Sequence, residues 1–265
     1  MIWIALILIL IGIVALRYVR VEKAQYDYNC FLLTLPESTE RREKFFRYHD
    51  PKIPIKVMNG INTRNVKNAR EFEEIIEPDY FEKAIEMHYN PSVKRPDITY
   101  FNLGAIGAYM GHLNIIKKCT HKYALIFEDN VIIKSPEFYD KVQSVIDELG
   151  NDFEMCFFHC LSRIPSEVNG DLEKVSWISS MKCYVVHVPN MKKYLKYYFP
   201  MDNHVDNKTE DIIARGARVY YKDLRKYMKI DRSGPSTIGH SQHGNQSYFS
   251  RQNPSLTPND VIYGY

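Results

Sequence analysis

Short strand-forming runs alternate with helix-forming stretches along most of the chain. The runs lie at 29–35, 53–60, 123–127, 153–160, 181–188 and 218–224, and helical patterns lie at 36–49, 102–119, 136–149, 190–199 and 209–217. Most of the runs are almost wholly apolar, which is typical of strands buried on both faces. Strands that alternate with helices favour a sheet covered on both sides. The sequence therefore predicts an α/β sandwich on a mostly parallel central sheet.

The predicted helix at 102–119 carries several glycines on one face. Gly104, Gly107 and Gly111 recur at i, i+3 and i+7, and Asn102 is placed to cap the helix. Each glycine costs up to about 1 kcal/mol relative to alanine in a helix interior. We therefore expect neighbouring backbone to approach this face closely. The preceding residues 61–100 are charged and interrupted by proline, and predict short helices at 69–77 and 79–88 with an ordered loop, as a lid or insertion.

Charge and cysteine content exclude some classes of function. The 265 residues carry 35 Lys and Arg against 32 Asp and Glu, a net charge of +3 with no concentrated basic face, so no nucleic-acid partner is predicted. The five cysteines are irregularly spaced and do not form a disulfide framework. Cys156 and Cys160 share a strand face that His159 does not, and no second pair completes a zinc site.

The N-terminal residues 2–16 contain no charged side chain. As a helix they rise only about 22 Å, against roughly 30 Å of hydrocarbon in a bilayer, so the predicted anchor extends over 1–19. A cleaved signal peptide is less favoured because the segment lacks a basic start and a small-residue cleavage site. The basic residues follow the segment, which predicts a single-pass membrane protein with its globular part in the cytosol. Residues 20–27 are then a linker, 28–240 the catalytic domain and 241–265 a polar tail.

The run YALIF at 123–127 ends in Glu128, Asp129 and Asn130. Acidic residues form strands poorly and are costly to bury without a partner. One interpretation is a turn between two strands, for which Asp-Asn is ordinary chemistry. The other is a strand that carries carboxylates to its C-terminal end, where open α/β sheets bind their ligands.

Three stretches in this order resemble glycosyltransferase family 25, which includes lipopolysaccharide and collagen galactosyltransferases: FLLTLPESTERREKF, LGAIGAYMGHLNIIKK and YALIFEDNVII. Later, KCYVVHVPNMKKYL resembles the family's Tyr-bearing strand and helix, and FPMDNHVDNKTEDI its Pro-then-Asp stretch. The resemblance covers roughly residues 28–240. The chain departs from the family pattern at four positions, where Ala105 replaces Glu, Ala108 replaces Cys, Gly111 replaces Ser and Asn130 replaces Asp.

The resemblance implies a GT-A-like fold and an inverting transfer of hexose, galactose or glucose, from a UDP-sugar to a hydroxyl of a glycan or glycoprotein. It implies Mn²⁺ or Mg²⁺ at Glu128, Asp129 and Asn130, with weaker binding because Asn130 lacks a charge. Asp206, in preference to Asp202, is the expected general base, although Asp206 is equally placed to cap a helix. The implied substrate-binding residues are Arg41, Arg42, Asn59, Gly60, His112 and Glu128.

Two other classes of function compete with this interpretation. Three of the departures, at Ala105, Gly111 and Asn130, favour a degenerate transferase fold that binds glycans or acts as a scaffold without catalysis. Loss of affinity for the nucleotide would distinguish that protein from an enzyme. A metal-dependent hydrolase would need a cluster of His or carboxylate residues, which the sequence does not contain.

Overall fold

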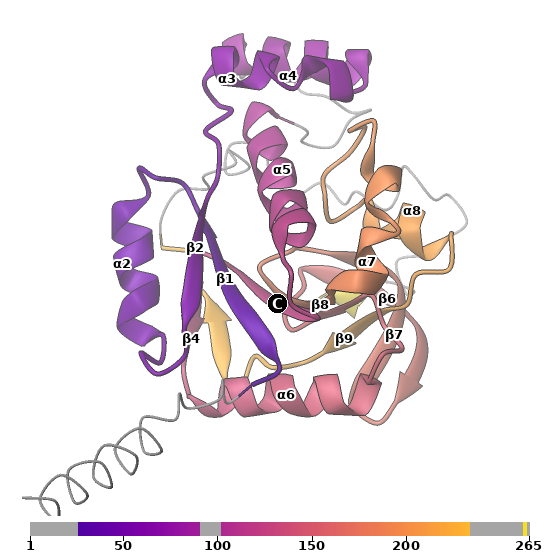
Figure 1. Ribbon diagram of the computed structural model, residues 1–265. Helices are drawn as coiled ribbons and strands as arrows, with labels where there is room; N and C mark the ends of the chain where they lie inside the picture. Colours follow the sequence, from indigo (N-terminus) through magenta and orange to yellow (C-terminus); the bar gives the residue numbers. More distant parts are fainter. Residues whose placement is uncertain (1–25, 91–101, 234–261, 264–265) are drawn as a thin grey trace, which may run out of the picture.

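The computed structural model describes residues 26–90, 102–233 and 262–263 (Figure 1). Within these residues a nine-stranded sheet has the order β11-β6-β7-β9-β5-β8-β3-β1-β2. The strands are β1 (Tyr28–Thr34), β2 (Ile55–Asn59), β3 (Tyr123–Glu128), β5 (Met155–Phe157), β6 (Ser162–Asn169), β7 (Leu172–Ser179), β8 (Cys183–His187), β9 (Val219–Lys222) and β11 (Ile262–Tyr263). β4 (Val131–Ile133) and β10 (Met228–Ile230) form a separate antiparallel ribbon.

Six of the nine strands run in the same direction, as in the predicted mostly parallel sheet, but three reversed strands that the sequence did not predict make five of the eight neighbouring pairs antiparallel. β2, β1, β3, β5, β9 and β6 run one way, and β8, β7 and β11 run the other way. β8 lies between β3 and β5 and is antiparallel to both. The three strands at the β2 side are parallel, so β1, β2 and β3 all end at the same edge of the sheet.

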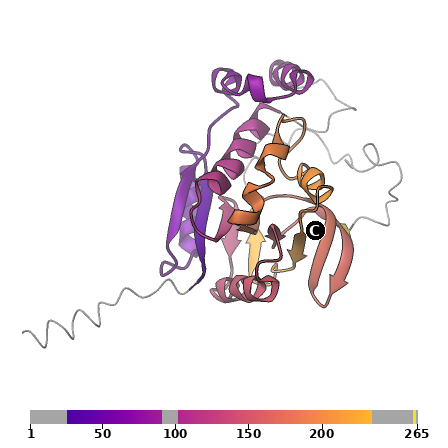
Figure 2. The same ribbon diagram turned by 45° about the vertical axis from the view of Figure 1, so that its right-hand side comes forward.

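Helices cover both faces of the sheet, as the alternating pattern predicts. The α-helices are α2 (Thr39–Tyr48), α3 (Val66–Arg70), α4 (Pro78–Tyr89), α5 (Leu103–Lys118), α6 (Glu137–Leu149), α7 (Val188–Lys192) and α8 (Thr209–Ile213), with 3-10 turns at Glu73–Ile75 and Leu195–Tyr198. α5 and α7 lie on one side of the sheet, and α6 lies on the other (Figures 1 and 2). The predicted sandwich is therefore present.

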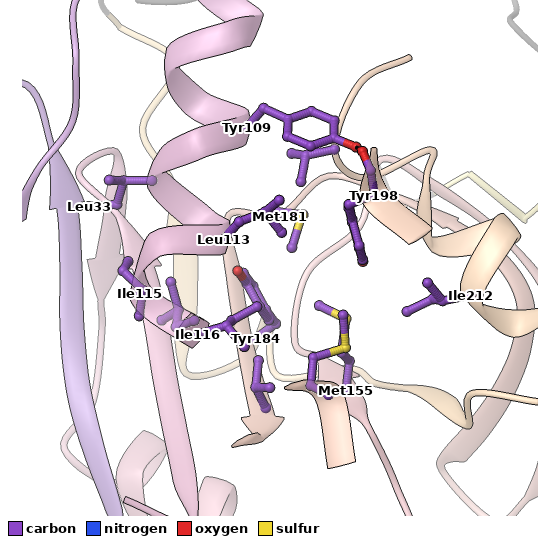
Figure 3. Packing of buried hydrophobic residues seen from close by; sticks show 14 of the residues in the cluster. Leu33, Tyr109, Leu113, Ile115, Ile116, Met155, Met181, Tyr184, Tyr198 and Ile212 are labelled. Carbon is purple, nitrogen blue, oxygen red and sulfur yellow. Dashed lines mark hydrogen bonds between the residues drawn. The ribbon is translucent and has the colours of Figure 1, made fainter. Parts of the chain in front are cut away.

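Alternate residues of each central strand enter two separate cores. In β3, Ala124 and Ile126 pack in the core that includes α5, whereas Leu125 and Phe127 pack in the core that includes α2 and α6. Figure 3 shows the first of these cores, where Leu113 and Ile116 of α5 pack close to Tyr184 of β8. Successive side chains of a strand point to opposite faces, which explains why a strand covered on both faces is apolar at every position.

Two local predictions differ from the structure. The β6–β7 hairpin was not predicted, although Asn169-Gly170 is a strong hairpin signal and Gly170 has a φ of +62°. The predicted cap of the helix at 190–199 was wrong. His187 caps α7, its Nδ1 accepting from the Asn190 backbone N–H at 3.2 Å, and the Asn190 amide instead donates to two backbone carbonyls. His187 is the last residue of β8, and its extended backbone lets it cap a helix that begins without a connecting loop.

The predicted membrane anchor at 1–19 lies outside the described residues, as does most of the linker. None of the helices within 26–90, 102–233 and 262–263 is long and apolar enough to span a bilayer. Most of the predicted polar tail also lies outside the described residues. Two of its residues, Ile262 and Tyr263, pair with Arg163 and Ser162 at the edge of the sheet.

The glycine face of α5 packs against backbone at Gly107, as predicted, and against a side chain at Gly111. The Gly107 N–H donates to Thr63 Oγ1 at 2.8 Å, and a methyl group at Gly107 would overlap the Ile61 carbonyl oxygen. At Gly111 the nearest atom to an added methyl group is the flexible end of Leu33, at 2.7 Å. Asn102 caps the helix, its side chain accepting from the Ala105 N–H. The glycines therefore let α5 approach both β1 and the loop after β2.

Gly107→Ala is expected to lower the free energy of unfolding by about 2–4 kcal/mol, because fixed backbone must move to admit the methyl group. Gly111→Ala, which meets only a side chain, should cost about 1 kcal/mol. Urea unfolding at pH 7 measures both variants. Equal losses at the two positions would contradict the close backbone contact at Gly107.

Candidate active site

A pocket opens at the edge of the sheet where β1, β2 and β3 end. The empty space in it amounts to about 510 Å³, which includes the open solvent at its mouth. The residues that line it come from the three strand ends, from the loop that follows β2 and from the first turns of α5. The lining residues are Leu33, Thr34, Leu35, Gly60, Ile61, Asn62, Thr63, Arg64, Gly104, Gly107, Ala108, Glu128 and Asp129.

Glu128 is the last residue of β3 and faces α5 from the pocket wall. Its Oε2 lies 2.6 Å from Lys182 Nζ, and its Oε1 lies 3.5 Å from Nε2 of the buried His112. His112 Nδ1 is in turn 2.8 Å from the Tyr184 hydroxyl. Burial opposes ionisation of Glu128, but the charge of Lys182 and the contact with His112 outweigh it and lower the pKa to about 2. Glu128 is thus a fixed carboxylate at neutral pH.

Asp129 contacts a different set of partners. Its Oδ2 accepts from the Thr34 hydroxyl at 2.8 Å, and its Oδ1 lies 3.2 Å from Arg41 Nη1 of α2. Burial raises the pKa of Asp129, and the nearby charge of Glu128 adds to this, while Thr34 and Arg41 act in the opposite direction. Asp129 and Asn130 form the turn between β3 and β4, so the turn interpretation and the ligand-site interpretation both describe this segment.

The predicted metal ligands do not converge on one point. Glu128 turns to Lys182 and Asp129 turns to Arg41, because neighbouring residues at the end of a strand point to different sides. The side-chain oxygen of Asn130 is buried, has no hydrogen-bond partner and is not part of the pocket wall. Within the described ranges no three His, Cys, Asp or Glu side chains gather as metal ligands. This arrangement does not fit a divalent metal held by Glu128, Asp129 and Asn130.

The other predicted binding residues divide into two groups. Gly60 lines the pocket, and its N–H donates to the Thr34 carbonyl at 2.8 Å. Arg41 reaches the pocket wall through Asp129. Arg42 points elsewhere and donates to the Pro36 carbonyl at 3.3 Å in an exposed position. Asn59 ends β2 next to the pocket but is not one of its lining residues.

Asp206 lies on the loop before α8 and does not cap that helix with its side chain. Its Oδ2 accepts from the Ser180 N–H at 2.6 Å, and its Oδ1 accepts from the Asn207 N–H. Ser180 has a φ of +90°, which is rare for a residue other than glycine and is a form of backbone strain associated with functional sites. Two residues later, Lys182 meets Glu128, so this strained turn leads directly to the pocket wall.

Two residues of this region were missed by the sequence analysis. Lys182 precedes β8 and neutralises Glu128, and Arg64 is the cationic side chain that lines the pocket. Arg64 lies in the predicted lid or insertion, where the Asn62-Thr63-Arg64-Asn65 turn was the available signal. Lys182 has no local signal, because only the pairing of β8 with β3 brings it to Glu128.

Comparison with solved structures gives low similarity at the level of sequence and fold. The UTP-bound UGPase from Acinetobacter baumannii is 10% identical, with a TM-score of 0.43, over 75% of this chain and 86% of that chain. A glycosyltransferase involved in the glycosylation of the major capsid of PBCV-1 is 11% identical, with a TM-score of 0.40, over 82% of this chain and 97% of that chain. No curated protein matches the sequence.

The family comparison is specific. The model of glycosyltransferase family 25, described as an LPS biosynthesis protein, matches residues 28–209. That span begins at β1 and ends at the first residue of α8, so it contains all three strand ends and the helix that form the pocket. The chain therefore belongs to glycosyltransferase family 25 and is a glycosyltransferase.

Proposed function

We propose that this glycosyltransferase takes a hexose, galactose or glucose, from a UDP-sugar and transfers it with inversion to a hydroxyl group of a glycan or glycoprotein. The donor occupies the pocket at the ends of β1, β2 and β3. The acceptor approaches from the side of Asp206, which takes the proton of its hydroxyl group. Residues 1–19 tether the enzyme to a membrane with its catalytic part in the cytosol, a placement that rests on the sequence.

The observation that carries the proposal is the position of the pocket. Ligands of open α/β sheets bind outside the C-terminal ends of the strands, and here three parallel strands end around one pocket. The N-terminal end of the 16-residue helix α5 contributes Gly104 and Gly107 to the same wall. A helix N-terminus favours negative charge, and Gly104 has no side chain to keep a phosphate away from the backbone, whereas the space at Gly107 is filled by Ile61 and Thr63. Family membership supplies the reaction class.

Hydrolysis of a panel of UDP-sugars tests the donor. The full-length protein in detergent is incubated with UDP-galactose, UDP-glucose and UDP-N-acetylglucosamine, with EDTA or with Mn²⁺, and release of UDP is measured. We expect turnover of a hexose donor that exceeds turnover of the N-acetylated sugar. GDP-mannose, which carries guanine in place of uracil, serves as a control for recognition of the nucleobase.

The panel also separates the enzyme from the competing binding module. Turnover of one UDP-hexose, with tight binding of that donor, supports the transferase and identifies the sugar. Binding of UDP without turnover in any condition would contradict catalysis while leaving the donor site in place. Absence of both binding and turnover would contradict a donor site in this pocket, and it is the result expected of the degenerate glycan-binding module.

A further inference from the structure

Three charged side chains line the pocket, and two of them are already neutralised by the protein. Glu128 is paired with Lys182 at 2.6 Å, and Asp129 with Arg41 at 3.2 Å. The third is Arg64. Its guanidinium has no ion-pair partner among the residues that the structure describes, and its side chain is exposed. The charge that remains at the pocket wall is therefore positive, and it belongs to Arg64.

The backbone that carries Arg64 is held in place by several hydrogen bonds. The Arg64 N–H donates to Asn62 Oδ1 at 3.2 Å, and Asn68 Nδ2 donates to the Asn62 carbonyl at 3.0 Å. The adjacent Thr63 is buried and bridges to α5, donating to the Leu103 carbonyl and accepting from the Gly107 N–H. These contacts fix the base of the Arg64 side chain relative to α5, while its end stays available for a ligand.

A nucleotide-sugar reaction needs positive charge at the diphosphate, which leaves with a growing negative charge. The carboxylates at the end of β3 do not provide a metal site for this purpose, because each is directed to its own cation. An arginine matches phosphate geometry by donating two parallel N–H bonds. In this pocket Arg64 is the described residue of that kind that has no carboxylate partner.

We infer that Arg64 binds the diphosphate of the donor, and that the protein binds this donor without a divalent metal. This inference rests on the proposed function, since it assumes a nucleoside diphosphate in the pocket. Lys182 and Arg41 serve a separate purpose: they cancel the charges of Glu128 and Asp129, so that the carboxylates do not repel the phosphates. Uridine, which lacks phosphate, makes no use of Arg64.

Binding of UDP and of uridine to the full-length protein tests the inference by calorimetry in EDTA. Arg64→Gln is expected to raise the Kd for UDP roughly 10- to 100-fold, the effect of losing a charge-assisted hydrogen-bonded pair. The Kd for uridine should change less than about twofold, because no charge is involved. Arg64→Lys should fall between wild type and Arg64→Gln. Arg70→Gln is the matched control, since Arg70, the last residue of α3, forms an exposed ion pair with Glu73 of the following 3-10 turn.

Each other outcome overturns a stated part of the inference. An unchanged Kd for UDP in Arg64→Gln excludes Arg64 as the phosphate ligand. Equal weakening of UDP and uridine shows that the variant alters the pocket in general. UDP binding by the wild type only in the presence of Mn²⁺ rejects metal-free binding but leaves the proposed function intact. If neither ligand binds under any condition, the proposed donor site fails together with the inference.

Discussion

Asp206→Asn is expected to lower the kcat of donor hydrolysis by about 10²- to 10⁴-fold, the contribution of a general base. The amide cannot take a proton from the attacking water, which replaces the acceptor hydroxyl group in hydrolysis. Its oxygen can still accept from the Ser180 N–H, as the carboxylate does at 2.6 Å. The strained turn at Ser180 should therefore keep its shape, and the Kd for UDP should stay within about twofold of the wild-type value. Release of UDP measures kcat, and calorimetry measures Kd.

The alanine variant separates the chemical role of Asp206 from a structural one. Asp206→Ala removes both the base and the acceptor of the Ser180 N–H, so it should weaken UDP binding as well as turnover. Asp171→Asn in the exposed β6–β7 turn is a matched control for loss of a carboxylate. If Asp206→Asn turns over at the wild-type rate while Asp206→Ala is slow, Asp206 is a positioning residue that holds Ser180.

The central strands could be predicted because each carries its own signal. β1, β3 and β8 are buried on both faces, so most of their positions are apolar and each run is visible without knowledge of its neighbours. The β6–β7 hairpin lacks that signal. Its outer residues 166–169 are exposed, and the dipeptide Asn169-Gly170 at the end of β6 was the available sign of the turn. Neither an apolar run nor a turn dipeptide indicates the direction in which a strand runs in the sheet. The reversed direction of β8 was therefore not predicted.

The site residues also differ in whether the local sequence identifies them. Glu128 and Asp129 were identified from the sequence because acidic residues at the end of an apolar strand are locally unusual. Their partners were not, because the Glu128–Lys182 pair joins positions that are 54 residues apart. That contact depends on the antiparallel register that places Phe127 opposite Cys183. No local pattern predicts that β8 lies antiparallel beside β3, so the sequence gives no sign that Lys182 reaches Glu128.

Lys182→Met is expected to reduce the kcat/KM of donor hydrolysis by about 30- to 100-fold and to destabilise the fold. Removing the ammonium group leaves Glu128 as an uncompensated negative charge in the pocket wall, where it repels the donor diphosphate. Breaking a fully buried pair costs about 3–5 kcal/mol. The side chains of Glu128 and Lys182 are 17% and 23% exposed, so we expect a smaller loss, about 1–2 kcal/mol, after solvent screening.

The pH dependence of this loss follows from the lowered pKa of Glu128. A carboxyl group whose pKa falls from 4.5 to about 2 on folding contributes stability that is fully present above pH 4.5. That contribution is lost as the pH falls toward 2, because the group becomes protonated in the folded state too. The difference in unfolding free energy between wild type and Lys182→Met should therefore be largest at neutral pH and shrink between pH 4.5 and pH 2. Urea titrations across this range measure it.

The double variant Lys182→Met/Glu128→Gln decides what Lys182 does. If its role is to cancel the charge of Glu128, then removing that charge as well should recover most of the lost stability and most of the lost affinity for UDP. That recovery would be consistent with separate roles for two residues: Lys182 neutralises Glu128, and Arg64 is the cation that faces the phosphates. If stability returns but UDP binding stays weak, Lys182 itself contacts the donor. The weak binding could then not be caused by repulsion from Glu128, because the double variant has no charge at that position. If neither returns, the pair is not the source of the effect.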